Sequence, residues 1–157
     1  MRYKKILAAI DRSPQATAVF EQALEIAKQE QASLMLFHCL PLEIQGTGFY
    51  SDIYDPAMNL YNQMQTQLDK EKEASQKLLE GYCQTAIAQG VTTEWDCKVG
   101  DAGSAIRDIT KAWDADLVVL GRRGRQGLSE VFLGSVSNYI VHNVSCSVLI
   151  VQGIGSQ

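Results

Sequence analysis

Short, nearly continuous apolar runs alternate along the chain with segments whose apolar residues recur every three or four positions. The apolar runs predict strands buried on both faces, because helices cover both sides of a parallel sheet. The segments with helical spacing predict amphipathic helices between those strands. The predicted strands are residues 6–10, 34–38, 91–99, 117–120 and 148–151.

Local signals indicate where several of the helices begin. Ser13-Pro14 predicts a helix start, since serine is a favoured N-cap and proline suits the first helical turn. A long helical pattern runs over residues 60–87. Farther along, Asp101 or Ser104 is suited to cap the helix that follows the third strand.

The regular alternation of strands and helices predicts a three-layer α/β sandwich with a parallel sheet and right-handed connections. At 157 residues, the chain is expected to form one domain over residues 1–157. The stretch 45–62 has no clear periodicity, and it is interpreted either as a flexible lid or as a segment that contacts a partner.

Composition and charge argue against several classes of protein. A net charge of −4 argues against a general nucleic-acid binder. No apolar run approaches the roughly twenty residues that span a bilayer, and the first apolar run is too short for a signal peptide. We therefore expect a cytoplasmic protein with neither a membrane nor a nucleic acid as its partner.

The cysteines and histidines show no spacing typical of a metal or redox motif. The cysteines are interpreted as small buried hydrophobic residues, and both histidines are expected to have structural roles. These residues are Cys39, Cys83, Cys97, Cys146, His38 and His142.

The segment after the fourth predicted strand has the spacing of a phosphate-binding loop. Gly121 and Gly124 stand three positions apart, and Gly134-Ser135 follows ten residues later at the start of a predicted helix. Glycine lets backbone N–H groups approach phosphate oxygens, and the N-terminus of a helix attracts anions. Ser135 adds a hydroxyl that could donate to phosphate or cap the helix. The pattern is neither a P-loop nor a Gly-x-Gly-x-x-Gly motif.

Asp11 is a second candidate, because it stands just past the first predicted strand. Open parallel sheets bind ligands beyond the carboxyl ends of their strands, where the strand order reverses. If the first and fourth strands are neighbours, Asp11 faces the glycine loop and could meet ribose hydroxyls or a magnesium ion. The alternative is that Asp11 is a turn residue or a helix cap.

Three segments and the order of the elements match a known family pattern. The segments read YKKILAAIDRSPQA, KVGDAGSAI and DLVVLGRRGRQGLSEVFLGSVSNYIVHNVSCSVLIV. They resemble the universal stress protein family, in its nucleotide-binding branch, and the pattern Gly-x-x-Gly, nine residues, Gly-Ser is their most specific part. The chain departs from the usual pattern at Arg12, Cys39 and Ser147, where glycine, valine and proline are common.

The resemblance implies a five-stranded sheet in the order 3-2-1-4-5, with ATP between the first and fourth strands. Asp11 would contact the ribose and phosphate region, together with Mg bound through ATP, and Ala9 and Cys39 would flank the adenine. The whole implied set is Ala9, Ile10, Asp11, Cys39, Leu120, Gly121, Arg123, Gly124, Gly134, Ser135 and Val136. Together with the apolar final strand, the resemblance also implies a homodimer through residues 148–151.

The function implied by the resemblance is that of an ATP-binding regulatory protein of the stress response. One alternative is a slow ATP hydrolase or phosphotransferase, and another is a sensor of AMP or a cyclic adenine nucleotide. Catalysis needs a positioned base or a residue that orients water. Because the sequence offers no evident base, we expect nucleotide binding with at most slow hydrolysis.

Overall fold

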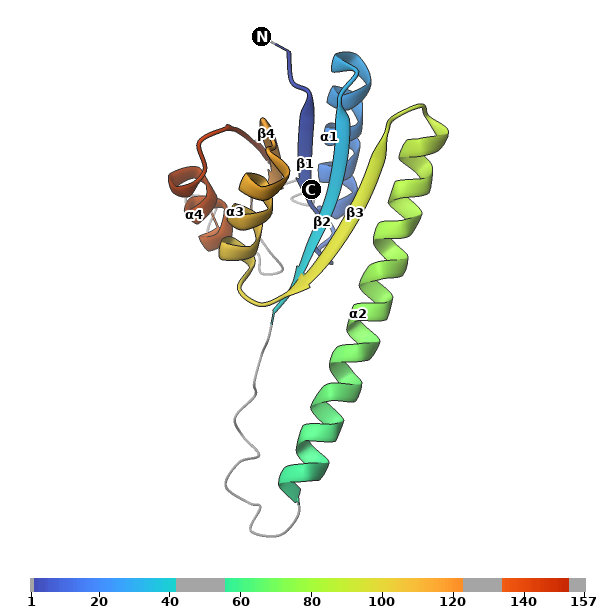
Figure 1. The fold of residues 1–157 in the computed structure, drawn as a ribbon, viewed down its shortest axis with the longest axis vertical. Helices are drawn as coiled ribbons and strands as arrows, with labels where there is room; N and C mark the ends of the chain where they lie inside the picture. The colour runs from blue at the N-terminus through green and yellow to red at the C-terminus, as the bar shows by residue number, and fades with distance from the viewer. Residues whose placement is uncertain (1, 42–55, 123–133, 153–157) are drawn as a thin grey trace.

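The computed structural model describes residues 2–41, 56–122 and 134–152, which form a sheet with helices on both faces (Figure 1). In chain order the elements are β1 (Lys5–Ala9), α1 (Ala16–Glu30), β2 (Ser33–Leu40), α2 (Pro56–Ala88), β3 (Thr93–Val99), α3 (Ala102–Trp113), β4 (Leu117–Gly121), α4 (Ser135–Asn143) and β5 (Ser147–Val151).

The sheet is parallel throughout, and its strand order is β3-β2-β1-β4-β5. This confirms the expected three-layer α/β fold with five strands. From β1 the chain builds outward in one direction to β2 and β3, and then in the other direction to β4 and β5. The strand order therefore reverses between β1 and β4, where such sheets commonly bind ligands.

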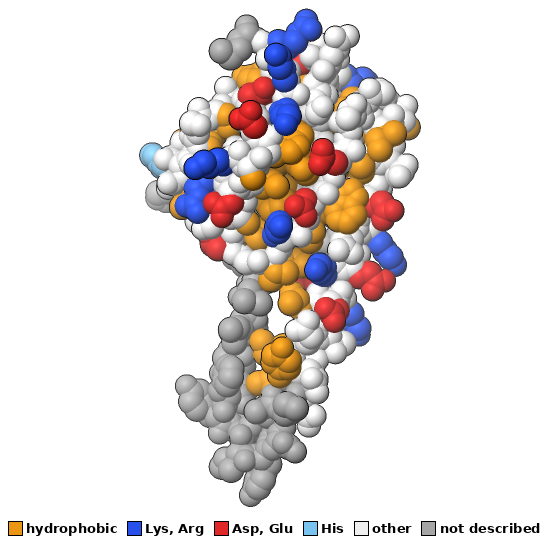
Figure 2. All heavy atoms as spheres, in the orientation of Figure 1, with side chains coloured by type: hydrophobic (Ala, Val, Ile, Leu, Met, Phe, Trp, Pro, Cys, Tyr) orange, Lys and Arg blue, Asp and Glu red, His pale blue; other side chains and the backbone are white. Residues whose placement is uncertain are grey.

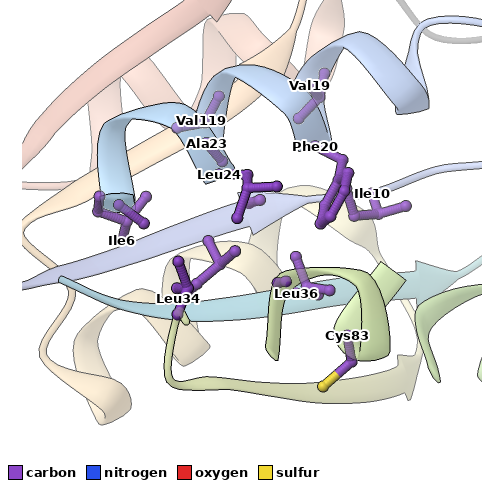
Figure 3. Close-up of a cluster of buried hydrophobic side chains, with 14 of the residues drawn as sticks. Ile6, Ile10, Val19, Phe20, Ala23, Leu24, Leu34, Leu36, Cys83 and Val119 are labelled. Carbon is purple, nitrogen blue, oxygen red and sulfur yellow. The ribbon is translucent and has the colours of Figure 1, made fainter. Parts of the chain in front are cut away.

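Two apolar cores lie on opposite faces of the sheet. Residues of α1 and α2 contribute to one core, and residues of α3 and α4 contribute to the other. In Figure 3, Phe20 and Leu24 of α1 point toward Leu34 and Leu36 of β2. Successive strand residues point to opposite faces, so a strand between two helical layers must be apolar at nearly every position.

The helix starts differ from those predicted. α1 begins at Ala16 and not at Ser13-Pro14, so the interpretation of Ser13 as the N-cap is wrong. Ser13 instead forms the turn before the helix: its Oγ accepts a 3.2 Å hydrogen bond from Gln15 N, and its carbonyl accepts one of 3.1 Å from Ala16 N. Serine side chains form such local turns as readily as they form caps.

The long second helix begins at Pro56, four residues before the predicted start at Leu60. Residues 56–62 of the stretch 45–62 are therefore helical, while residues 42–55 lie outside the described part. α2 extends well beyond the end of the sheet (Figure 1). Its contact with the core comes from its C-terminal half, through Leu79, Cys83 and Ala86.

Acidic and basic side chains are interspersed on the visible face of the molecule, with hydrophobic side chains between them (Figure 2). Among the described residues, no helix combines the length and the apolar character that are needed to cross a bilayer.

Candidate functional site

A cavity of about 180 Å³ opens at the carboxyl ends of β1, β2 and β4, beside α3 and the start of α4. Nine of the eleven residues predicted to contact a nucleotide line it, and the other two, Arg123 and Gly124, lie outside the described residues. The nine are Ala9, Ile10, Asp11, Cys39, Leu120, Gly121, Gly134, Ser135 and Val136. Residues from four separate segments of the chain therefore meet at one place.

The pairing of β1 with β4 brings Asp11 to the same crevice as the glycine segment. The two strands are parallel neighbours, with Ala8 opposite Val119. Their carboxyl ends therefore lie at the same edge of the sheet, which is the condition under which Asp11 was expected to face the glycine segment. Both Asp11 and Gly121 line the cavity at this edge.

Asp11 is also a turn residue, which was one of the alternatives to a binding role. Its Oδ1 accepts a 2.9 Å hydrogen bond from the backbone N of Ser13, which closes a turn of the kind typical of aspartate. The turn and the cavity are compatible, because a carboxylate has two oxygens and about four acceptor sites. Asp11 therefore keeps capacity for a further donor or a cation.

Gly121 meets α1 on the face of the sheet opposite to α3 and α4. A Cβ added at this position would lie 2.8 Å from Gln15 Oε1 and 3.5 Å from Val19 Cγ2. The absence of a side chain at Gly121 therefore leaves room for the end of the Gln15 side chain, while Val19 lies at an ordinary contact distance. The sequence interpretation gave the approach of phosphate and the conformational freedom of the loop as reasons for glycine, and it did not include this contact.

Arg122 and Gly134, which flank residues 123–133, are hydrogen-bonded to each other. Gly134 N donates a 2.9 Å hydrogen bond to the carbonyl of Arg122, and Arg122 N donates one of 3.0 Å to the carbonyl of Val151. In addition, Ser137 Oγ donates to the carbonyl of Gly121 over 2.7 Å. These bonds fix the beginning of α4 against the ends of β4 and β5.

The N-terminus of α4 faces the cavity through Gly134, Ser135 and Val136. Gly134 is the N-cap residue, and within the described part of the chain no side chain caps the helix. Ser135 is the first residue of the helix, so its hydroxyl is not an N-cap. The first N–H groups of a helix lack partners inside the helix and carry partial positive charge, which favours an anion here.

Cys39 presents a neutral thiol to the cavity. Burial raises the pKa of Cys39 to about 11, and the nearby Asp101 acts in the same direction. Its Sγ lies 3.4 Å from the carbonyl oxygen of Gly100. The thiol is therefore protonated at neutral pH, and it forms part of the wall without adding charge. Of the four cysteines only Cys83 is buried, so the expectation of buried cysteines holds in part.

Several residues of the cavity were not predicted to belong to a site. They are Phe37, His38, Ala102, Ile106 and Ser137. The predicted cap Asp101 is confirmed, since its side chain accepts a 3.0 Å hydrogen bond from Ser104 N, and this bond holds the pKa of the Asp101 carboxyl below its usual value. Ala102, the next residue, still reaches the cavity. The strand order could have identified Ala102 as a cavity residue, because it places the start of α3 beside the end of β2.

The described part of the site combines an apolar wall, a carboxylate and the N-terminus of a helix. Ala9, Phe37, Leu120 and Ile106 offer the kind of surface against which a flat base packs. Asp11 is suited to hydroxyl groups or a cation, and the start of α4 is suited to an anion. The arrangement is that of a small-molecule site at the switch point of a parallel α/β sheet.

The comparisons with known proteins agree with this class of fold. Residues 2–152 match the model of the universal stress protein family. The universal stress protein Sll1388 of Synechocystis sp. is 47% identical over 153 residues, which cover 97% of this chain and 99% of that protein. The chain belongs to the universal stress protein family.

Solved structures show the same fold at lower identity. The structure of the hypothetical protein MJ0577 has a TM-score of 0.80 at 20% identity, covering 99% of this chain and all of that one. The universal stress protein from Archaeoglobus fulgidus in complex with dAMP has a TM-score of 0.61 at 20% identity, covering 96% of this chain and 98% of that one. A universal stress protein in complex with cAMP has a TM-score of 0.64 at 21% identity, covering 97% and 98% of the two chains.

Proposed function

We propose that this universal stress protein binds an adenine nucleotide in the cavity at the ends of β1 and β4, with ATP as the preferred ligand, and that the bound nucleotide regulates its partners in the stress response. The observation that carries the proposal is the meeting of nine predicted residues around one cavity. Two structural relatives, those in complex with dAMP and with cAMP, support an adenine nucleotide as the class of ligand.

The described residues divide into an apolar part and a polar part, as a nucleotide does. Ala9, Cys39 and Leu120 would contact the base, whereas Asp11 would bind the ribose and phosphate region. Gly134, Ser135 and Val136 would place the N–H groups of α4 toward the phosphates. The cavity is smaller than the roughly 300–1,000 Å³ of complete ligand pockets. Arg123 and Gly124, which were also expected to line the ribose and triphosphate, lie outside the described residues.

Magnesium fits this site as a companion of the phosphates. Among the described residues, no three His, Cys, Asp or Glu side chains form a cluster that could hold a metal ion. Mg²⁺ bound with nucleotides usually takes one or two carboxylates together with phosphate oxygens and water. Asp11 would supply the carboxylate, and the ion would neutralise phosphate charge.

Binding without rapid hydrolysis is the proposed mode of action. Of the described cavity residues, Asp11 and His38 are the two that could serve as a base near neutral pH. Oδ1 of Asp11 already accepts a hydrogen bond from Ser13 N, and Nε2 of His38, the ring nitrogen left to accept a proton, is buried. Phosphate release at about one per second or faster, near the low end of enzyme turnover, would favour the hydrolase alternative.

Equilibrium dialysis of the purified protein with ATP, AMP and cAMP, with and without magnesium, tests the proposal. We expect ATP with magnesium to be retained most strongly. The Ser135→Ala variant should weaken ATP binding by about 0.5–3 kcal/mol, the range from an ordinary hydrogen bond to one with a charged group. If no adenine nucleotide is retained at millimolar concentration, the proposal is wrong, and preference for cAMP or AMP would favour the sensor alternative.

We also propose that the protein is a homodimer that pairs through β5. β5 is an edge strand of the sheet, and Val148, Leu149 and Ile150 remain partly exposed there. Unpaired strand edges with apolar side chains favour pairing with another strand.

A further inference from the structure

The side chain of His38 extends the contact between β1 and β2 by one residue. His38 is only 6% exposed, and its Nδ1 lies 2.7 Å from the carbonyl oxygen of Ile10. A carbonyl oxygen can only accept, so Nδ1 carries the proton and donates it. Ile10 N in turn donates a 2.8 Å hydrogen bond to the carbonyl of Phe37. Ile10 is therefore held at both its N–H and its carbonyl, although the last residue of β1 is Ala9.

This anchor lies directly before the cavity carboxylate. Asp11 follows Ile10, and its Oδ1 accepts the hydrogen bond from Ser13 N. The backbone at Asp11 is thus fixed on one side by His38 and on the other side by its own turn. Loss of either contact would free the segment between β1 and α1, and the carboxylate would lose its fixed place in the cavity.

At a buried position whose role is only to fill space, histidine is less favourable than an apolar residue. His38 Nε2 is buried, and among the described residues it has no hydrogen-bond partner. A buried polar atom without a partner is unfavourable, whereas leucine would fill much of the same space without one. The hydrogen bond of Nδ1 to Ile10 is the feature that an apolar side chain could not supply.

We propose that His38 is a positioning residue of the nucleotide site, acting through the carbonyl of Ile10 to hold Asp11 toward the ribose and phosphates. This inference rests on the proposed nucleotide function. Asp11 makes the contact with the ligand, and His38 sets where its carboxylate lies.

Two substitutions separate the hydrogen bond from the filling of space. His38→Leu removes the donor, whereas His38→Asn keeps an N–H donor close to the position of Nδ1. By calorimetric titration with magnesium and ATP, His38→Leu should raise the dissociation constant roughly 3- to 10-fold, the equivalent of one ordinary hydrogen bond. His38→Asn should stay within about twofold of the wild type, by the same estimate. Urea denaturation establishes that each variant is folded.

A double-mutant cycle separates positioning from general damage to the fold. In an Asp11→Ala background no carboxylate remains to be positioned, so adding His38→Leu should change ATP affinity by less than about twofold. An equal loss in both backgrounds would overturn the proposal, as would a His38→Asn variant that binds as poorly as His38→Leu.

Two measurements without nucleotide keep the inference testable on its own. Nitrogen NMR of the wild-type protein should show His38 as the Nδ1–H tautomer, and finding the proton on Nε2 of the neutral ring would refute the proposal even if His38→Leu does not fold. Hydrogen exchange at Ser13 N should accelerate in His38→Leu and return toward the wild-type rate in His38→Asn. If wild-type protein binds no adenine nucleotide while both results hold, the proposed function fails but the positioning of Asp11 stands.

Discussion

Ser137 Oγ donates a 2.7 Å hydrogen bond to the carbonyl of Gly121, sixteen residues earlier in the chain. Ser137 is 4% exposed and Gly121 is half-buried, so the hydroxyl is shielded from water and the carbonyl is shielded in part. The bond joins the first turn of α4 to the last residue of β4. The end of β4 and the start of α4, which flank residues 123–133, are therefore held together by a side chain that stands outside the glycine pattern.

Replacing this serine should destabilise the fold. Ser137→Ala leaves the Gly121 carbonyl without its side-chain donor, and we expect the free energy of unfolding to fall by about 1–3 kcal/mol. Urea denaturation followed by circular dichroism measures the change. Ser135→Ala is the matched control, because Ser135 is exposed, and its stability should remain within about 0.5 kcal/mol of the wild type. Equal stability of the two variants would show that the hydrogen bond contributes little.

The two substituted serines also illustrate what the sequence could predict. Ser135 was identified because it belongs to a spacing that can be read along the chain. Ser137 acts through its position relative to Gly121, which depends on how α4 docks on the sheet. The same holds for His38: its place at the end of an apolar run was visible, but its bond to Ile10 follows from the pairing of β1 with β2.

The fold was more predictable than the ends of its elements. A parallel strand covered by helices on both faces must be apolar throughout, so runs such as residues 6–10 and 117–120 were correctly identified as strands. The starts of α1 and α2 were misplaced because serine and proline signals favour turns as well as caps. The strand order came from the family resemblance, because periodicity alone does not specify which strands are neighbours.

A second prediction concerns two glycines whose missing side chains have different consequences. A Cβ at Gly103 would lie 2.9 Å from Cδ1 of the Tyr139 ring, whose hydroxyl accepts a hydrogen bond from Arg107. Gly103→Ala should therefore destabilise the packing of α3 on α4 by about 1–3 kcal/mol. At Gly121 the nearest atom is the flexible end of Gln15.

The matched variant Gly121→Ala should cost less than about 1 kcal/mol, since the Gln15 side chain can turn away. Thermal or urea denaturation of both variants gives the comparison. Adding Gln15→Ala to Gly121→Ala should recover most of that loss, whereas it should not affect Gly103→Ala. A Gly121→Ala variant less stable than Gly103→Ala would contradict the packing described here.

A third prediction concerns the stability of the fold at mildly acidic pH. Burial lowers the pKa of His38 below its usual value, and the charge of Arg12 acts in the same direction, while the hydrogen bond to Ile10 and the charge of Asp11 oppose them. Between this lowered pKa and the ordinary value of about 6.5, the unfolded chain binds more protons than the folded chain. The free energy of unfolding therefore falls as the pH drops through that window, and the contribution of His38 is complete above it.

Urea midpoints measured from pH 7.5 to pH 5 test this prediction. The wild type should lose stability below about pH 6.5, and His38→Asn should lose less over the same range. If His38→Asn shows the full wild-type dependence, other groups account for the acid sensitivity.

The last prediction concerns the two edges of the sheet, which differ in chemistry. The edge strand β3 carries Asp96 and Lys98, and charged residues on an edge discourage pairing with another chain. The other edge strand, β5, reads SVLIV without a charge. A two-fold axis beside β5 would let the strand pair with its own copy. We therefore expect dimerisation through β5 and not through β3.

Lysine substitutions on each of the two edges distinguish these possibilities. Val148 and Ile150 are partly exposed on β5, whereas Val151 is buried in the core and would be unsuitable. Val148→Lys with Ile150→Lys should convert a dimer into monomers in sedimentation experiments at micromolar concentration, because each contact would bring like charges together. Val99→Lys, at a β3 position that is 39% exposed, should leave the dimer unchanged. Circular dichroism establishes that both variants are folded. A monomeric wild-type protein, or a dimer that only Val99→Lys disrupts, would show that β5 is not the interface.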